Sequence, residues 1–263
     1  MTTLTGTTAG LLLAALAVGP LVAQNLPARI AAAPDGEVRL TFASREGICG
    51  DGATFIRALN RDNHGAMSGD WRDWRSRPCE EGQVRIRLRV QGGEVRSVRT
   101  AVGGIWRPSE ERVTDLGRIG AAEAARGLLS MARNSYGKGN DLIFPATLAD
   151  SVTLWPDLLE LARDRQAASS SRKNAVFWLS QAAGDKAADG LERIVTDEGD
   201  DRDVREHAVF AISQLPQDQG VPILLRVART NPNPGVRRKA MFWLGQSDDP
   251  RALSLFEDIL TKP

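Results

Sequence analysis

The sequence contains the stretch Arg172-Lys-Asn-Ala-Val-Phe-Trp-Leu-Ser-Gln181, and it recurs as Arg205-Glu-His-Ala-Val-Phe-Ala-Ile-Ser-Gln214 and Arg237-Arg-Lys-Ala-Met-Phe-Trp-Leu-Gly-Gln246. The three stretches align without gaps and share Arg, Ala, Phe and Gln at matching places, at spacings of 33 and then 32 residues. Self-similarity at a period of about 20 to 50 residues is typical of stacked supersecondary units. These stretches therefore predict a helical-repeat architecture.

A second amphipathic segment follows each copy. Its apolar residues have the i, i+3, i+4 spacing of one helical face. They are Leu191, Ile194 and Val195, then Leu224, Val227 and Ala228, then Phe256, Ile259 and Leu260. Two earlier segments, Leu158-Leu-Glu-Leu-Ala-Arg163 and Leu128-Leu-Ser-Met-Ala-Arg133, match the same pattern. We expect helical repeats over residues 118–263, with five copies of the second helix and about four of the first, stacked into an α-α superhelix or solenoid.

The repeats resemble a known family. Val204-Arg205-x-x-Ala208 and Val236-Arg237-x-x-Ala240 resemble the Val-Arg-x-x-Ala signature of HEAT repeats, and Ser171-Arg172-x-x-Ala175 is a weaker copy. The short period is similar to the bacterial, PBS-lyase-type HEAT subclass, and Phe144-Pro-Ala-Thr-Leu-Ala-Asp150 is similar to a segment of exported bacterial HEAT-repeat proteins. The resemblance implies a protein-interaction scaffold, and it implies no reaction because fold and function are separable.

The resemblance also implies a structural role for the signature residues, which are Arg172, Ala175, Arg205, Ala208, Arg237 and Ala240. In HEAT arrays the Arg pairs with an acidic residue of the same or the next repeat. Asp201 and Asp203 are the expected partners of Arg205 or Arg172. Asn233 and Ala168 occupy the matching places before the other two signature arginines, so the pattern predicts an interrupted ladder.

The segment before the repeats, residues 37–107, predicts a small antiparallel β module. Residues 37–43, 83–90 and 94–102 alternate between apolar and polar positions, and Gly92-Gly93 is a hairpin turn signal. In the middle strand, Arg85, Arg87 and Arg89 point away from the apolar face. We expect an irregular loop over residues 45–78, because no period is sustained there.

The first residues predict export. Residues 1–23 contain an uncharged apolar stretch, too short to span a bilayer comfortably, and are interpreted as a signal peptide. A retained N-terminal anchor is the alternative. Residues 24–36 are expected to be a linker. Cys49 and Cys79, the two cysteines, would form a disulfide in a periplasmic or extracellular compartment.

Two surfaces are candidates for binding. The recurring aromatic residues Phe177, Trp178, Phe210, Phe242 and Trp243 are expected in the core between helices. Trp178 and Trp243, which Ala211 replaces in the middle repeat, are expected to be half-buried, and they are the residues that we select if any aromatic side chain is exposed. Arg85, Arg87 and Arg89, with Arg96 and Arg99 on the partner strand, form a basic stripe. The stripe either binds an anionic ligand or is a solvated face that blocks edge aggregation.

The sequence favours a non-enzymatic scaffold of the cell envelope that binds a protein partner, with no cofactor and no metal. The formal net charge of +1 disfavours nucleic acid. The alternative is a ligand-binding or hydrolytic β module around His64, near Asp62, Asp70 and Asp73, with the repeats as a docking arm. No GxSxG or GxxxxGK[ST] motif supports catalysis.

Overall fold

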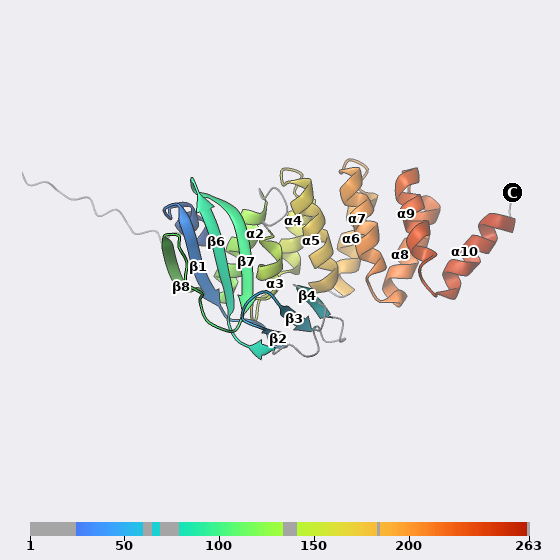
Figure 1. The fold of residues 1–263 in the computed structure, drawn as a ribbon. Helices are drawn as coiled ribbons and strands as arrows, with labels where there is room; N and C mark the ends of the chain where they lie inside the picture. Colours follow the sequence, from blue (N-terminus) through green and yellow to red (C-terminus); the bar gives the residue numbers. More distant parts are fainter. Residues whose placement is uncertain (1–24, 60–64, 69–78, 134–140, 183–184, 262–263) are drawn as a thin grey trace, which may run out of the picture.

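The computed structural model describes residues 25–59, 65–68, 79–133, 141–182 and 185–261. Its N-terminal part contains two small sheets, and its C-terminal part is a row of helices (Figure 1). The expected signal peptide lies outside the described residues. No helix in the described ranges combines the length and the apolar character needed to cross a membrane.

The larger sheet has the strand order β7-β6-β1-β8. Its strands are β1 (Gly36–Phe42), β6 (Val84–Gln91), β7 (Glu94–Val102) and β8 (Val113–Arg118). β6 runs antiparallel to β1 and β7, as the alternating pattern predicts. β8 lies parallel to β1, so the sheet is mixed rather than purely antiparallel.

The second sheet occupies part of the segment that the sequence predicts as an irregular loop. It has the order β4-β3-β2-β5, with β2 (Ile48–Gly50), β3 (Ile56–Leu59), β4 (Gly65–Ser68) and β5 (Glu80–Glu81). The prediction was wrong because strands of two to four residues are too short to show an alternating pattern. A disulfide joins Cys49 to Cys79, as expected.

A short helix, α1 (Leu26–Ala31), replaces the expected linker. The Asn25 side chain accepts a hydrogen bond from the amide of Ala28 and caps the helix, and a proline lies in its first turn. Leu26 and Ile30 are buried. Leu26 packs against Gly127 of α2 (Ala121–Ala132), so these two helices belong to the same core as the inward-facing side chains of the larger sheet.

The remaining helices form two rows. The first row contains α3 (Ile143–Thr147), α5 (Ser169–Ala182), α7 (Arg202–Ser213) and α9 (Pro234–Leu244). The second row contains α2, α4 (Trp155–Arg163), α6 (Asp185–Thr196), α8 (Gln217–Thr230) and α10 (Pro250–Thr261). Neighbours in each row are in contact, and α4, α6 and α8 each contact the first-row helix that follows them. Figure 1 shows the pairs side by side along the molecule. The alternation of helices agrees with the predicted five second helices and four first helices.

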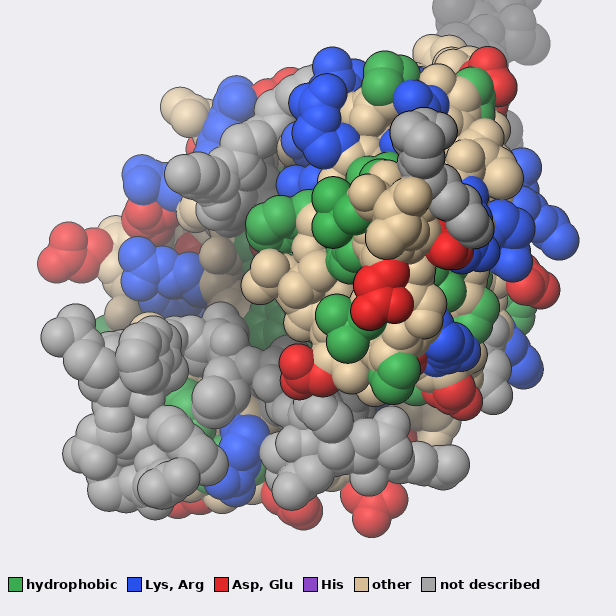
Figure 2. Space-filling view, turned by 90° about the vertical axis from the view of Figure 1, so that its right-hand side faces the viewer, with side chains coloured by type: hydrophobic (Ala, Val, Ile, Leu, Met, Phe, Trp, Pro, Cys, Tyr) green, Lys and Arg blue, Asp and Glu red, His purple; other side chains and the backbone are tan. Residues whose placement is uncertain are grey.

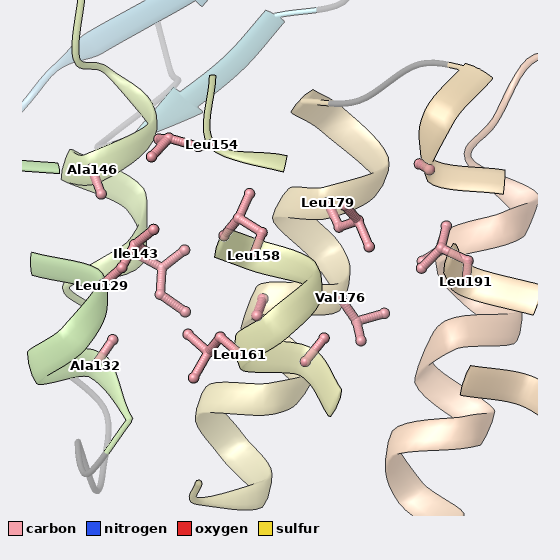
Figure 3. Packing of buried hydrophobic residues seen from close by; sticks show 14 of the residues in the cluster. Leu129, Ala132, Ile143, Ala146, Leu154, Leu158, Leu161, Val176, Leu179 and Leu191 are labelled. Carbon is pink, nitrogen blue, oxygen red and sulfur yellow. The ribbon is translucent and has the colours of Figure 1, made fainter. Parts of the chain in front are cut away.

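One hydrophobic core runs through the repeats and reaches the sheet. Leu158, Leu161, Val176, Leu179 and Leu191 project between successive helices (Figure 3) and belong to the same buried cluster as the inward-facing residues of the sheet. Backbone contacts reinforce the junction, because the end of β1 meets the end of α3. Ser44 forms an isolated bridge with Ala149 there. The sheet is therefore packed onto the first helices of the array.

The C-terminal end of the row is less buried than the repeat pattern predicts. Phe256 is half-buried, whereas Ile259 and Leu260 of α10 are 49% and 85% exposed. The expectation that they would be core residues was wrong, because no described helix packs beyond α10 to cover them. Figure 2 looks onto this end of the molecule, where hydrophobic side chains are interspersed with acidic and basic ones.

Candidate functional site

The signature arginines lie near the N-terminal ends of α5, α7 and α9. Arg172 donates a hydrogen bond to Asp200 at 2.5 Å and another, from Nε, to the carbonyl of Ala162 at 2.9 Å. The acidic partner is therefore Asp200, not Asp201 or Asp203. Asp201 is instead the N-cap of α7, and the Asp201 side chain accepts a hydrogen bond from the amide of Asp203.

The series of arginine–carboxylate pairs is interrupted after Arg172 and Asp200. Arg205 is 6% exposed, and its Nε has no hydrogen-bond partner among the described residues. Arg237 donates to the carbonyls of Asn231 and Pro232 rather than to a carboxylate. Asn233 is the N-cap of α9 and is not charged, in agreement with the predicted break.

The signature alanines have a packing role. Ala175, Ala208 and Ala240 are each 0% exposed and lie in α5, α7 and α9, which contact one another in order. A small side chain at each position lets neighbouring helices approach closely. These residues therefore belong to the core of the array and not to a binding surface.

The exposed member of the aromatic row is Phe242, and not Trp178 or Trp243 as the sequence favoured. Trp178 and Trp243 are half-buried and pack against the core, with ring centroids 5.4 Å from Phe144 and 5.1 Å from Phe210, respectively. Phe210 is half-buried, whereas Phe242 is 54% exposed. Both tryptophan rings pack against an aromatic residue of the preceding first-row helix, whereas Phe242, one residue before Trp243, is exposed.

A line of nitrogen-bearing side chains runs beside the aromatic row. Asn174, His207 and Lys239 are at matching positions of α5, α7 and α9, and all three are half-buried. Burial lowers the pKa of His207 below its usual 6.5, and the nearby charges of Lys173 and Lys239 lower it further. His207 is therefore neutral at pH 7, and the two lysines carry the positive charge of this face.

We define the first-row face by nine aromatic or nitrogen-bearing side chains of α5, α7 and α9. Glu206 of α7 lies at the position that matches Lys173, pairs with Arg202 and is not included. The face consists of Lys173, Asn174, Phe177, Trp178, His207, Phe210, Lys239, Phe242 and Trp243. His207 contacts Phe210, with ring centroids 5.6 Å apart. Phe242 meets Trp243 edge to face at 5.0 Å. The face therefore offers aromatic rings on α5, α7 and α9, and ammonium groups on α5 and α9.

The predicted arginine stripe is divided into buried and exposed members. Residues 103–112, which connect β7 to β8 and which we call the strap, cross the outer face of the sheet. Arg85 is 7% exposed beneath the strap and donates to the carbonyls of Gly103, Ile105 and Gly52. The expectation that Arg85 points into solvent was wrong, because the strap covers it.

The other arginines of the outer face have different surroundings. Glu37, itself buried, pairs with both Arg39 and Arg87. Arg89 is 65% exposed in its side chain and lies 3.3 Å from Glu111 at the end of the strap. Only Arg89 of the three predicted residues is a freely solvated surface group.

The alternative site around His64, Asp62, Asp70 and Asp73 lies outside the described residues. Within the described ranges, no group of three His, Cys, Asp or Glu side chains is arranged to hold a metal ion. The only described histidine, His207, lies in the repeats.

The row of helix pairs places the chain among the helical-repeat proteins, and the comparison with protein families gives the particular type. A family model for HEAT repeats matches residues 198–263, which contain α7, α8, α9 and α10. Residues 198–263 therefore have the sequence pattern of HEAT repeats. The search of curated proteins found no match to the sequence.

Proposed function

We propose that this protein is a non-enzymatic scaffold of the cell envelope, and that the first-row face binds a protein partner. HEAT repeats generally serve protein interactions, and the match over residues 198–263 supports that role for the C-terminal half. We also propose that the array curves as a superhelix and that this face forms its groove. The repeats are further proposed to be of the PBS-lyase-type subclass, which the spacing of 33 and 32 residues supports.

The observation that carries the proposal is the position of Phe242. Its side chain is 54% exposed, although it belongs to a row whose other members are at least half-buried. Aromatic side chains are enriched in the cores of protein interfaces because they bury a large area with few rotatable bonds. An exposed ring continuous with Phe210 and Trp243 is therefore a suitable anchor for a partner.

The charge of the face specifies the partner's chemistry. Lys173 and Lys239 flank the aromatic residues, and both lower the pKa of His207 through their charge, so they lie near the centre of the face. A segment with carboxylates beside apolar side chains would complement both features. We therefore expect a partner with an acidic, apolar segment rather than a basic one.

The envelope location is supported by two features of the N-terminal half. The uncharged apolar stretch within residues 1–23 has the character of a signal peptide, and the Cys49–Cys79 disulfide suits an oxidising compartment. Fractionation of cells, followed by thiol alkylation without reductant, tests the proposal. Protein found outside the cytoplasm with both cysteines unreactive would support it, and cytoplasmic protein with reactive thiols would contradict it.

Binding is tested by capture from envelope extract with the protein starting at Gln24. The test variant carries Lys173→Glu, Lys239→Glu and Phe242→Ser on the first-row face. The control carries Arg193→Glu and Arg229→Glu, which make the same charge change at exposed positions of the second row. A partner that is lost only with the test variant is expected. Equal capture by both variants, or no capture by the unaltered protein, would contradict binding at this face.

A further inference from the structure

We propose that the pocket between the strap and the outer face of the larger sheet binds a small phosphate monoester that carries an apolar or aromatic group. This site lies in the β module and is independent of the repeat face proposed above. It is formed by three segments: β6 with β7, the strap, and the turn after β2. The lining residues are Gly52, Ala53, Thr54, Arg85, Arg87, Arg99, Thr100, Ala101, Ile105, Trp106 and Arg107.

The pocket has the size of a small-molecule site. Its volume is about 380 Å³, and pockets for small ligands are commonly about 300 to 1,000 Å³. Such a volume accommodates a phosphate with an attached ring or short chain. It is too small for a folded domain or a duplex, so the expected ligand is a small molecule.

The charge of the pocket is strongly one-sided. Four arginines line it, and no acidic residue does so among the described residues. Glu37, which pairs with Arg39 and Arg87 at its edge, is one carboxylate shared by two guanidinium groups. The pocket therefore retains a large positive charge that a doubly charged anion would neutralise.

Two of the four arginines are available to a ligand. The structure gives the guanidinium groups of Arg99 and Arg107 no hydrogen bond or ion pair with any described residue, and both side chains are exposed. A guanidinium presents paired N–H donors that match the oxygens of a phosphate. Arg99 comes from β7 and Arg107 from the strap, so an anion between them would join the two walls of the pocket.

The floor of the pocket is already ordered. Arg85 is fixed by three carbonyl acceptors, including Gly103 at 2.7 Å and Gly52 at 2.6 Å. Its pKa is lowered mainly by burial and then by the charges of Arg87 and Arg107, which shows that these positive groups lie close together. Glu37 partly neutralises Arg87, whereas Arg85 and Arg107 have no ion pair with any described residue, so a bound anion would relieve their mutual repulsion.

The apolar part of the ligand is specified by Trp106 and Ile105. Arg39 and Arg85 lie over the Trp106 ring, at 5.2 and 5.1 Å from its centroid, and hold it in place. Ile105 is 84% exposed at the same rim. An exposed isoleucine next to a fixed indole is a surface on which a ring or aliphatic group could be buried.

The turn after β2 and the strap are in close backbone contact beside the pocket. Gly52 and Gly104 both have positive φ angles, of 71° and 66°. A Cβ built on Gly52 would lie 2.9 Å from the Cα of Gly104. The turn after β2 and the strap therefore meet through glycines beside the pocket that Arg99 and Arg107 both line.

The test is calorimetric titration of the protein with phenyl phosphate, inorganic phosphate and benzoate in low-salt buffer. We expect phenyl phosphate to bind more tightly than the other two probes, because only it has both a dianion and a ring. Arg99→Gln and Arg107→Gln should each weaken phenyl phosphate binding about tenfold or more, since each removes a charge-assisted hydrogen bond. Both side chains are exposed, so the variants should fold, which thermal melting checks.

The matched control is Arg96→Gln, which removes an exposed arginine from the same strand outside the pocket lining. Its affinity should equal that of the unaltered protein. Equal affinity in the Arg99→Gln, Arg107→Gln and Arg96→Gln variants would overturn the proposal, as would the absence of heat with every probe. Binding to vesicles containing phosphatidic acid without binding to phenyl phosphate would also overturn it, in favour of a lipid headgroup.

Discussion

Arg172 and Asp200 form an ion pair with 2.5 Å between Nη2 and Oδ2, and each side chain is 4% exposed. The pair joins α5 to the turn before α7, and Arg172 also holds the carbonyl of Ala162 at the end of α4. One arginine therefore joins α4, α5 and the turn between α6 and α7. Removing one partner of a buried pair is costly because the other charge stays buried and uncompensated.

Asp200→Asn should reduce the free energy of unfolding by about 3 kcal/mol, since the Arg172 charge would remain buried without a counter-charge. The control is Asp197→Asn. Asp197 lies in the same turn as Asp200 and pairs with Arg165. Both of these side chains are exposed, so water screens the pair and a much smaller change is expected. Urea titration of both variants measures the difference. Equal stabilities would show that the buried pair does not stabilise the array.

Arg85→Gln should destabilise the β module far more than Arg89→Gln. Loss of the Arg85 guanidinium leaves the carbonyls of Gly52, Gly103 and Ile105 without their donor, at a cost of about 3 kcal/mol. Arg89 is mostly exposed and pairs only with Glu111, so its replacement should change stability little. Hydrogen exchange of the strap amides is a second measurement. Similar effects of the two substitutions would contradict the division of the arginine stripe.

His207 should make the protein less stable as the pH falls. Its pKa in the folded state is lowered below 6.5 by burial and by Lys173 and Lys239, so the unfolded chain binds more protons between the two pKa values. This penalty is absent above the unfolded pKa and is complete below the folded one. Urea titrations at pH 7.5 and at lower pH should show a smaller loss for His207→Asn, which places the residue of the neighbouring repeat, Asn174, at this position. An equal loss in both proteins would assign the pH dependence to other groups.

The Cys49–Cys79 disulfide should stabilise the β module. It closes a loop with a sequence separation of 30 residues, for which the chain-entropy model gives about 3 to 4 kcal/mol. The double variant Cys49→Ala, Cys79→Ala should therefore unfold at lower urea concentration than the unaltered protein. In the presence of reductant the two proteins should be similarly stable. A difference that persists in reductant would indicate a packing defect caused by alanine.

The repeat architecture could be predicted because each repeat carries its own signal. The recurring Arg172, Arg205 and Arg237, with the apolar i, i+3, i+4 pattern after each, identified both helices of the pairs. Neighbouring repeats supply the contacts, so a local pattern is sufficient to predict them. Where the pattern had no following repeat, at Ile259 and Leu260, the prediction of burial was wrong.

The partner of Arg172 shows what a repeat pattern leaves out. Sequence spacing favoured Asp201 and Asp203, but the turn before α7 uses Asp201 to cap the helix and turns Asp200 inward. The helix cap and the ion pair each need a carboxylate in this turn, and the two carboxylates are adjacent in sequence. Spacing alone therefore does not tell which of them caps the helix and which pairs with Arg172. Sequence reasoning also did not predict the exposure of Phe242, which depends on the rotation of α9 against α7.

By itself the sequence determined the helical repeats, the three main strands and the disulfide, because hydrophobic periodicity, recurring signatures and cysteine number are local properties of the chain. Only the tertiary structure decided the arginine pocket. The parallel pairing of β8 with β1 requires the strap to cross the outer face of the sheet, and that crossing buries Arg85 and brings Arg107 into the same pocket lining as Arg99. Contacts between segments that are distant in sequence have no local pattern, so the pocket could not be predicted from the residues that line it.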